Sequence, residues 1–183
     1  MISGSARAQS GPSTFKNEVS GGYLYGDSLA PYEAYGGSSG YSLGYSYRLL
    51  HWLALEAGFQ HLLHAPDTVY CCAQTTGHVY YEYAGARFVW EPKILSRLRL
   101  SAGGGYGHSF YHPPFVLRFG QRPDQLHSLP ESVAAVDYAL TRSGRWRAGV
   151  QARFYVAINR NNGAGTSVSG YYTLSPQLTF AFH

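Results

Sequence analysis

The strongest constraint on this chain is an alternation of apolar residues with small or polar residues at a period of two. In the segment 40–47, tyrosine and leucine alternate with glycine and serine at every position. This spacing puts the two kinds of residue on opposite faces of a β-strand. Eight segments show the pattern: 17–26, 40–47, 53–60, 77–90, 97–107, 132–141, 145–156 and 172–182.

The connections between these strands alternate in length along the chain. The longer connections are 27–34, 62–76, 111–130 and 159–165, and the shorter ones are 48–51, 91–94 and 141–144. In an up-and-down barrel, successive connections lie at opposite ends, and outer-membrane barrels have short turns at one end and long loops at the other. The sequence therefore predicts an all-β fold, an eight-stranded antiparallel up-and-down transmembrane β-barrel.

Composition indicates which face of the strands lies inside the barrel. Aromatic residues make up 16% of the 183 residues, charged residues only 13%, and lysine occurs twice. A soluble barrel would expose a face rich in lysine and glutamate, whereas the non-aromatic face here is mainly glycine, serine, alanine and glutamine. Small residues suit the narrow lumen of an eight-stranded barrel. We therefore expect the aromatic face to contact outer-membrane lipids, with a soluble ligand-binding barrel as a distant alternative.

Charge and cysteine content exclude several classes of protein. The net charge is +4, but the arginines are scattered and form no basic run, so we expect no nucleic-acid binding. No apolar stretch approaches the roughly 18 residues of a transmembrane helix. Two cysteines are too few for a disulfide-built scaffold. In an oxidising exterior, Cys71 and Cys72 would form a strained vicinal disulfide or pair with another chain.

The first residues carry a weak signal for export. Ala6 and Ala8 have the small-residue spacing of a signal-peptidase site, although the basic and apolar parts of a signal peptide are missing before them. We interpret residues 1–14 as the remnant of a signal peptide and a flexible tail. Residues 15–183 would form the barrel domain, and the expected location is the bacterial outer membrane.

The charged residues of the strands fall mostly on the face assigned to the lumen. These residues are Glu18, Glu56, Arg97, Arg99, Asp137, Arg147 and Arg153. An isolated charge away from water is very costly, so they must pair. We expect an arginine–carboxylate network that plugs the lumen, with Gln151 and Gln177 in hydrogen-bonding positions. In the alternative, Arg97 and Arg145 lie at the water-exposed ends and pair with nothing.

The segment 77–90 leaves its facing open. It is aromatic on both faces, and Glu82 and Arg87 fall on opposite faces of a regular strand. A β-bulge between them would bring both to the same face.

Several segments together resemble a known family. They are 101–107, 136–141, 146–156 and the ending 175–183. The chain resembles the small outer-membrane β-barrels of Gram-negative-type bacteria, the OmpA-type barrel and the porin/opacity group, over about residues 15–183. The resemblance implies that the barrel-assembly machinery recognises Leu178, Phe180 and Phe182. His183 follows this signal and displaces it by one residue.

The sequence shows no catalytic or cofactor-binding motif. His108 and Ser109 could suggest a lipid-modifying barrel enzyme, but adjacent strand residues point to opposite faces and cannot form a dyad without a bulge. The pairs His61/His64 and His108/His112 lack accompanying ligands at a recognisable metal spacing. We therefore expect no catalytic residues, no metal and no cofactor.

The expected function is that of a structural or surface-interacting barrel. The connections 62–76 and 111–130 carry the aromatic residues Tyr70, Tyr111, Phe115 and Phe119. Such aromatic loops can bind an extracellular ligand or pack over the barrel mouth. A narrow channel for small or hydrophobic solutes is the alternative within this fold. A lipid-modifying enzyme is the alternative from another class.

Overall fold

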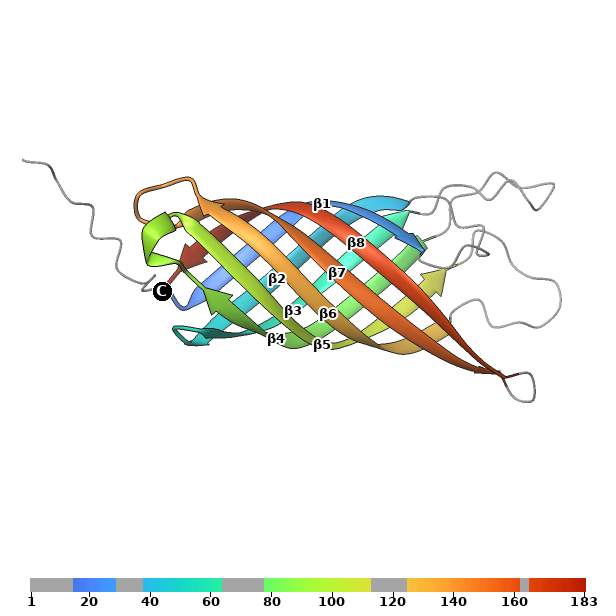
Figure 1. Ribbon diagram of the computed structural model, residues 1–183. Coiled ribbons are helices and arrows are strands. Elements are labelled where there is room, and N and C mark those ends of the chain that lie inside the picture. The colour runs from blue at the N-terminus through green and yellow to red at the C-terminus, as the bar shows by residue number, and fades with distance from the viewer. Residues whose placement is uncertain (1–14, 29–37, 64–77, 113–124, 162–164) are drawn as a thin grey trace, which may run out of the picture.

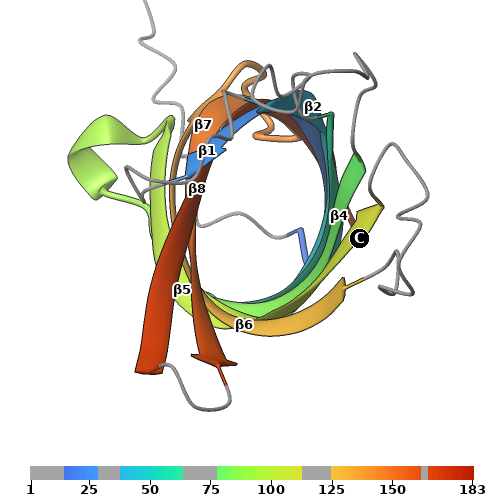
Figure 2. The ribbon, with the colours of Figure 1, turned by 90° about the vertical axis from the view of Figure 1, so that its right-hand side faces the viewer.

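The computed structural model describes residues 15–28, 38–63, 78–112, 125–161 and 165–183, and it confirms the predicted fold class. Eight antiparallel strands follow one another around a closed barrel, and β1 pairs with β8 to close it (Figures 1 and 2). The strands are β1 (Asn17–Ser28), β2 (Ser38–Leu50), β3 (Leu53–Leu63), β4 (His78–Trp90), β5 (Leu98–His112), β6 (Gln125–Ala139), β7 (Trp146–Asn161) and β8 (Gly165–Phe182). The short 3-10 helix η1 (Lys93–Leu95) lies between β4 and β5. None of the helical residues described is part of a helix long and apolar enough to span a membrane.

The two ends of the barrel differ. At the end that we call the turn end, on the left in Figure 1, the chain enters β1 and leaves β8, and short connections join β2 to β3, β4 to β5 and β6 to β7. At the opposite end, the loop end, the strands are joined by 29–37, 64–77, 113–124 and 162–164, which lie outside the described residues. Cys71 and Cys72 belong to one of these segments, and residues 1–14 also lie outside the description.

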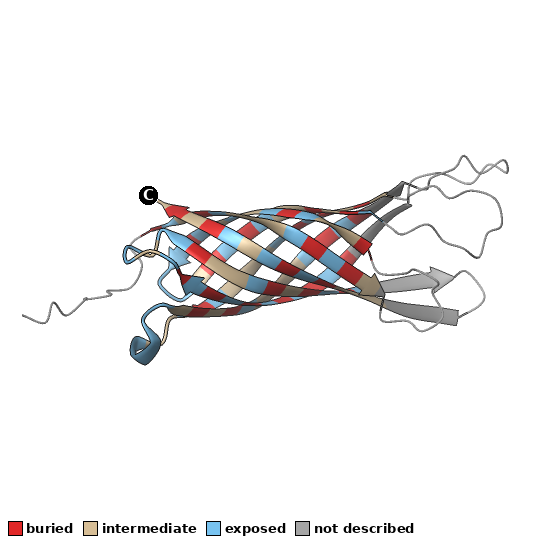
Figure 3. Ribbon diagram, turned by 90° about the horizontal axis from the view of Figure 1, so that it is seen from above, coloured by how far each residue is buried: buried red, intermediate tan, exposed pale blue. Residues whose placement is uncertain are grey.

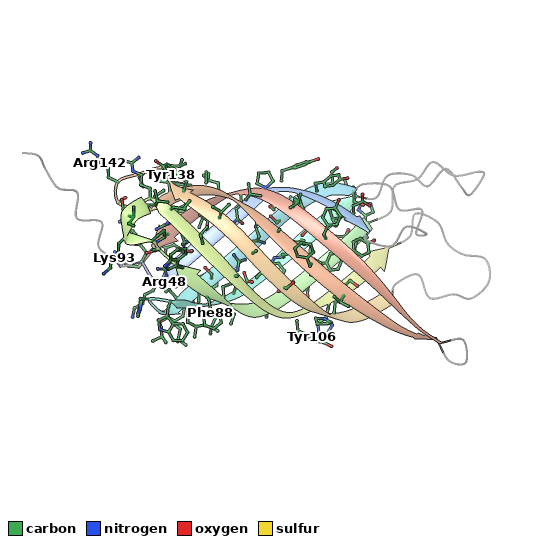
Figure 4. The ribbon with its side chains drawn as sticks, viewed as in Figure 1. Arg48, Phe88, Lys93, Tyr106, Tyr138 and Arg142 are labelled. Carbon is green, nitrogen blue, oxygen red and sulfur yellow. The ribbon has the colours of Figure 1, made fainter. Side chains whose placement is uncertain are left out.

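Burial alternates along each strand, as Figure 3 shows. Outward-facing side chains are apolar and exposed, for example Phe88 at 65% and Trp90 at 62%. Figure 4 shows Phe88, Tyr106 and Tyr138 projecting away from the wall. Inward-facing Gln60 and Arg153 are fully buried. The molecule therefore has an apolar exterior around a polar interior, the reverse of a soluble barrel.

The predicted connection 111–130 is wrong at both ends, because β5 continues to His112 and β6 already begins at Gln125. Pro130 lies within β6. The ladder between β6 and β7 begins only at the next residue, Glu131, so Pro130 has no β7 partner to which it would have to donate. The predicted connection 159–165 is also too long. Strand β7 continues to Asn161, and β8 already begins at Gly165.

The structure decides the facing of the segment 77–90, which the sequence left open, and the described ladders contain no bulge there. The pairing of β4 with β3 and β5 is continuous, so Glu82 faces outward and Arg87 faces the lumen. The strand is aromatic on both faces because Tyr81 and Tyr83 lie inside the barrel, 2% and 6% exposed. Glycines on the neighbouring strands leave the space for these large rings, as described below.

A proline and a glycine shape the seam between β1 and β8. The ladder is interrupted between the pairs Gly22↔Gln177 and Tyr25↔Leu174, where Pro176 has no N–H to donate. Ser175 compensates, because its hydroxyl donates to the carbonyl of Tyr23 at 2.9 Å. A Cβ atom at Gly22 would collide with the carbonyl oxygen of Pro176. The close approach of the two backbones therefore requires glycine at position 22.

This contact predicts a difference between two adjacent glycines. We expect Gly22→Ala to lower the free energy of unfolding by about 1–3 kcal/mol, because the backbones at the seam must move apart. Gly21→Ala is the matched control, since a Cβ there would meet the flexible Leu43 side chain at 3.3 Å and the Ser42 carbonyl oxygen at an ordinary contact distance of 3.6 Å. Denaturant unfolding of the folded barrel in detergent micelles measures both variants. Equal losses of stability in both would contradict this account of the seam.

Candidate functional site

The lumen gathers the polar side chains of all eight strands and is the candidate functional site. The eight residues expected there do not form one network. Glu18, Arg99, Asp137, Arg147 and Gln177 lie towards the turn end, whereas Glu56, Gln151 and Arg153 lie near the middle of the barrel. The lumen is filled in three layers: two ionic networks and an apolar cluster.

The first layer is the turn-end network. Its members are Glu18, Arg48, Glu91, Arg99, Asp137 and Arg147. Arg99 lies at its centre, with Nη1 at 2.5 Å from Glu18 Oε1 and Nη2 at 3.0 Å from Asp137 Oδ2. Gln177 donates through Nε2 to the other oxygen of Asp137 at 3.4 Å. These contacts join β1, β5, β6 and β8 across the lumen.

Glu91 extends this layer from just beyond the end of β4. Its Oε1 accepts from Nη1 and Nη2 of Arg48 at 3.2 Å and from Nη2 of Arg147 at 3.5 Å. Arg48 Nη2 also lies 3.8 Å from Glu18 Oε1. Three arginines thus face three carboxylates, and the layer carries no net charge.

The second layer is the central network of Glu56, Arg87, Glu131 and Arg153. The fully buried Arg153 bridges two carboxylates, with Nη2 at 2.8 Å from Glu56 Oε2 and Nη1 at 2.8 Å from Glu131 Oε1. Arg87 pairs with Glu56 as well, and it donates to Gln151 Oε1 at 2.8 Å. Two arginines against two carboxylates make this layer neutral too.

Tyr83 supports the central network from the wall. The guanidinium carbon of Arg153 lies 3.5 Å from the centre of the Tyr83 ring, a close cation–π contact. The Tyr83 hydroxyl crosses Gly58 and approaches Gly44, and a Cβ at Gly58 would collide with the ring. Gly44, Gly58 and Tyr83 are register partners on three adjacent strands. The two glycines therefore let Tyr83 lie along the wall beneath Arg153.

The third layer, towards the loop end, is an apolar cap that the sequence analysis did not predict. It consists of Leu24, Leu62, Val79, Tyr81, Leu129 and Tyr155, all at most 4% exposed. The rings of Tyr81 and Tyr155 stack with centroids 4.7 Å apart. The Tyr155 hydroxyl donates to Gln60 Oε1 at 2.8 Å, so this buried phenol has a hydrogen-bond partner.

A cavity of about 30 Å³ lies between the two ionic networks. Its walls include Glu18 and Arg99 from the first layer, and Glu56, Tyr83 and Arg87 from the second. One water molecule needs roughly 10–15 Å³ by this measure, so the cavity has room for about two. A space of this size suits water molecules between the two networks.

Sequence reasoning missed four members of the networks: Arg48, Arg87, Glu91 and Glu131. Arg48 and Glu131 each lie one residue beyond a predicted strand, yet they share the parity of inward residues on that strand. Extending the alternation by one residue would have found both. The direction of Arg87 was undecided because Glu82 and Arg87 fall on opposite faces of a regular strand. Glu91 follows the end of β4, where alternation no longer determines direction.

Other residues singled out from the sequence lie away from the networks. Arg97 and Arg145 are exposed at the turn end, where the guanidinium carbon of Arg145 lies 5.5 Å from the Phe15 ring centre. His108 is exposed on the outer surface, whereas Ser109 is buried on the lumen side, so the two do not meet.

Two histidines near the loop end form a pair that differs from both pairs considered in the sequence. His61 Nε2 lies 3.0 Å from His78 Nδ1, and their rings are nearly parallel on the outside of β3 and β4. His64 lies outside the described residues. Within the described ranges, no group of three or more histidine, cysteine, aspartate or glutamate side chains is arranged to hold a metal ion.

Comparisons with protein-family models and with curated protein sequences find no match. Solved structures do match. Outer membrane protein OprG from Pseudomonas aeruginosa is 9% identical, with a TM-score of 0.66 over 95% of this chain and 99% of that one. Neisserial surface protein A is 16% identical, with a TM-score of 0.58 over 92% and 97%. Ail, the attachment invasion locus protein of Yersinia pestis, solved with the heparin analogue sucrose octasulfate, is 16% identical, with a TM-score of 0.56 over 91% and 99%. This chain has the fold of the small eight-stranded outer-membrane β-barrels.

The central network predicts a large cost for removing one partner. We expect Arg153→Met to lower the free energy of unfolding by about 3–5 kcal/mol, because two buried carboxylates lose their bridging cation. Adding Glu131→Gln should recover part of that loss, since one uncompensated charge is removed with it. Denaturant unfolding in micelles measures the single and double variants. Arg145→Met, at an exposed site, should change stability by at most about 0.5 kcal/mol, and a similar loss at both arginines would contradict the prediction.

Proposed function

We propose that this chain is a closed, non-catalytic barrel of the bacterial outer membrane, and that its rigid wall presents the loop-end connections for interactions at the cell surface. The observation that carries the proposal is the filling of the lumen by two charge-neutral ionic networks and an apolar cap. The outer-membrane location is supported by the apolar exterior and by the fold shared with OprG. Outer-membrane lipids and the barrel-assembly machinery, acting on Leu178, Phe180 and Phe182, are the expected partners.

Opening this lumen would require breaking ion pairs away from bulk water. Arg99 and Arg153 each bridge carboxylates from different strands, so neither side chain can swing aside without breaking two ion pairs. Asp137 would lose the pair with Arg99, and Glu131 the pair with Arg153. A buried carboxylate that loses its partner is strongly destabilising. The layers also differ in chemistry, so a solute able to pass the ionic networks would then meet the apolar cap. These features favour a plug over the alternative of a narrow channel.

The loop-end connections have the composition of a contact surface. The segments 29–37, 64–77 and 113–124 hold five aromatic residues: Tyr32, Tyr35, Tyr70, Phe115 and Phe119. The same segments contain two arginines and three carboxylates, so their charge is close to balanced. Ail was solved with a heparin analogue, but this composition does not favour a polyanion. An extracellular ligand bound through 62–76 and 111–130 would be held mainly by aromatic contacts.

The proposal predicts that the barrel does not conduct ions. Purified protein inserted into a planar lipid bilayer should show no stable conductance, because the filled lumen offers no continuous aqueous path. A variant with Arg99→Ser, Arg153→Ser and Tyr155→Ser removes one large side chain from each layer. We expect this variant to conduct small ions measurably.

A general porin inserted in the same bilayers controls for the sensitivity of the measurement. A difference in migration between unheated and heated samples on a denaturing gel verifies that the triple variant is folded. Stable wild-type conductance at the level of the porin would refute the plug and favour the channel.

A further inference from the structure

The turn end of the barrel carries a rim of exposed cations. They are Lys16, Lys93, Arg97, Arg142 and Arg145, and they come from three separate segments of the chain. Figure 4 shows Lys93 and Arg142 projecting at this end. Among the described residues, none of the five forms an ion pair, whereas the nearby carboxylates Glu18, Glu91 and Asp137 are each held by lumenal arginines. The rim therefore presents uncompensated positive charge.

Aromatic residues define the level of this rim. All three tryptophans of the chain, Trp52, Trp90 and Trp146, are at the turn end and are 41–62% exposed. Trp52 stacks on the exposed Phe88 with centroids 5.6 Å apart. Exposed tryptophans on a membrane barrel mark the boundary between hydrocarbon and headgroups. Lys93, Arg97 and Arg145 lie in the connections just beyond these strand ends, which is the level of lipid headgroups.

The helix η1 adds an apolar element at the same level. Ile94 is 95% exposed and Leu95 57% exposed, and no residue of η1 is buried. In Figure 2, η1 is the light-green coil that stands outside the ring of strands instead of covering the lumen. Its exposed apolar side chains are therefore not covered by the barrel. Lys93 belongs to the same turn and places a cation beside them.

We propose that the turn-end rim is a binding site for anionic phospholipid headgroups. Lys93, Arg97, Arg142 and Arg145 bind the phosphates, while η1 inserts Ile94 and Leu95 among the first acyl carbons. The charge complementarity of an all-cationic rim selects an anionic lipid, and the apolar turn anchors the rim at the interface. The inference rests on the proposed membrane location and adds a preference for one lipid class.

Native mass spectrometry of the folded full chain in uncharged detergent micelles tests the inference. Phosphatidylglycerol and phosphatidylcholine with the same acyl chains are added in turn, and bound lipids are counted. We expect wild type to retain phosphatidylglycerol about tenfold better, and the preference to fall as salt is raised. Lys93→Gln with Arg97→Gln should abolish most of this preference, because each charge removed is worth roughly fivefold and the two together exceed the preference of wild type.

Three further variants separate charge from other effects. Lys93→Arg with Arg97→Lys should keep the preference, because the charge is retained. Arg118→Gln with Arg122→Gln removes two charges from the connection between β5 and β6 and should also leave it unchanged. Ile94→Ser should weaken the binding of both lipids equally, because it removes only the apolar anchor.

Equal binding of the two lipids by wild type, or an unchanged preference in the Lys93→Gln, Arg97→Gln variant, would overturn the inference. So would a dimeric species that is lost in Ile94→Ser, since a second copy would then cover η1. A wild type that neither conducts ions nor prefers phosphatidylglycerol would refute only this inference and leave the proposed function intact. A wild type that conducts ions and keeps the preference would refute the plug and support the lipid site.

Discussion

The hydrogen bonding of the backbone is the constraint on which the rest of this structure depends. A strand surrounded by lipid cannot leave N–H and C=O groups unpaired, and closing the sheet removes its edges. Here β1 pairs with β8, and even the gap that Pro176 leaves in that ladder is met by the Ser175 hydroxyl. Closure with eight strands leaves a lumen only wide enough for side chains. The filling of the interior therefore follows from the closing of the wall.

The interior meets the cost of burying charge by balancing it within each layer. Three arginines face three carboxylates in the turn-end network, and two face two in the central network. Local neutrality matters because charges in a region of low dielectric cannot be compensated from a distance by solvent. The large side chains also need room, which Gly44 and Gly58 provide beneath Tyr83. Charge balance and glycine placement together let so narrow a lumen hold five arginines.

The outer surface divides the molecule according to its surroundings. The strands present leucine, tyrosine and phenylalanine to lipid, and the three tryptophans mark the turn-end boundary. Beyond that boundary lie the exposed cations and η1, and at the other end lie the aromatic connections. If the barrel is plugged as we propose, it acts through its ends and its lipid contacts. The proposed surface interaction and the proposed lipid site are consistent with that division.

The sequence alone determined the strands, their order and the facing of most residues, because alternation at a period of two is a local property of the backbone. It also placed Glu18, Arg99, Asp137 and Arg153 on the inward face. Only the tertiary structure decided which charge meets which. Partners such as Arg153 and Glu56 are 97 residues apart, and the stagger between distant strands sets their height in the lumen. The apolar cap was equally hidden, because inward leucines and tyrosines look like lipid-facing ones until closure of the barrel determines what lies opposite them.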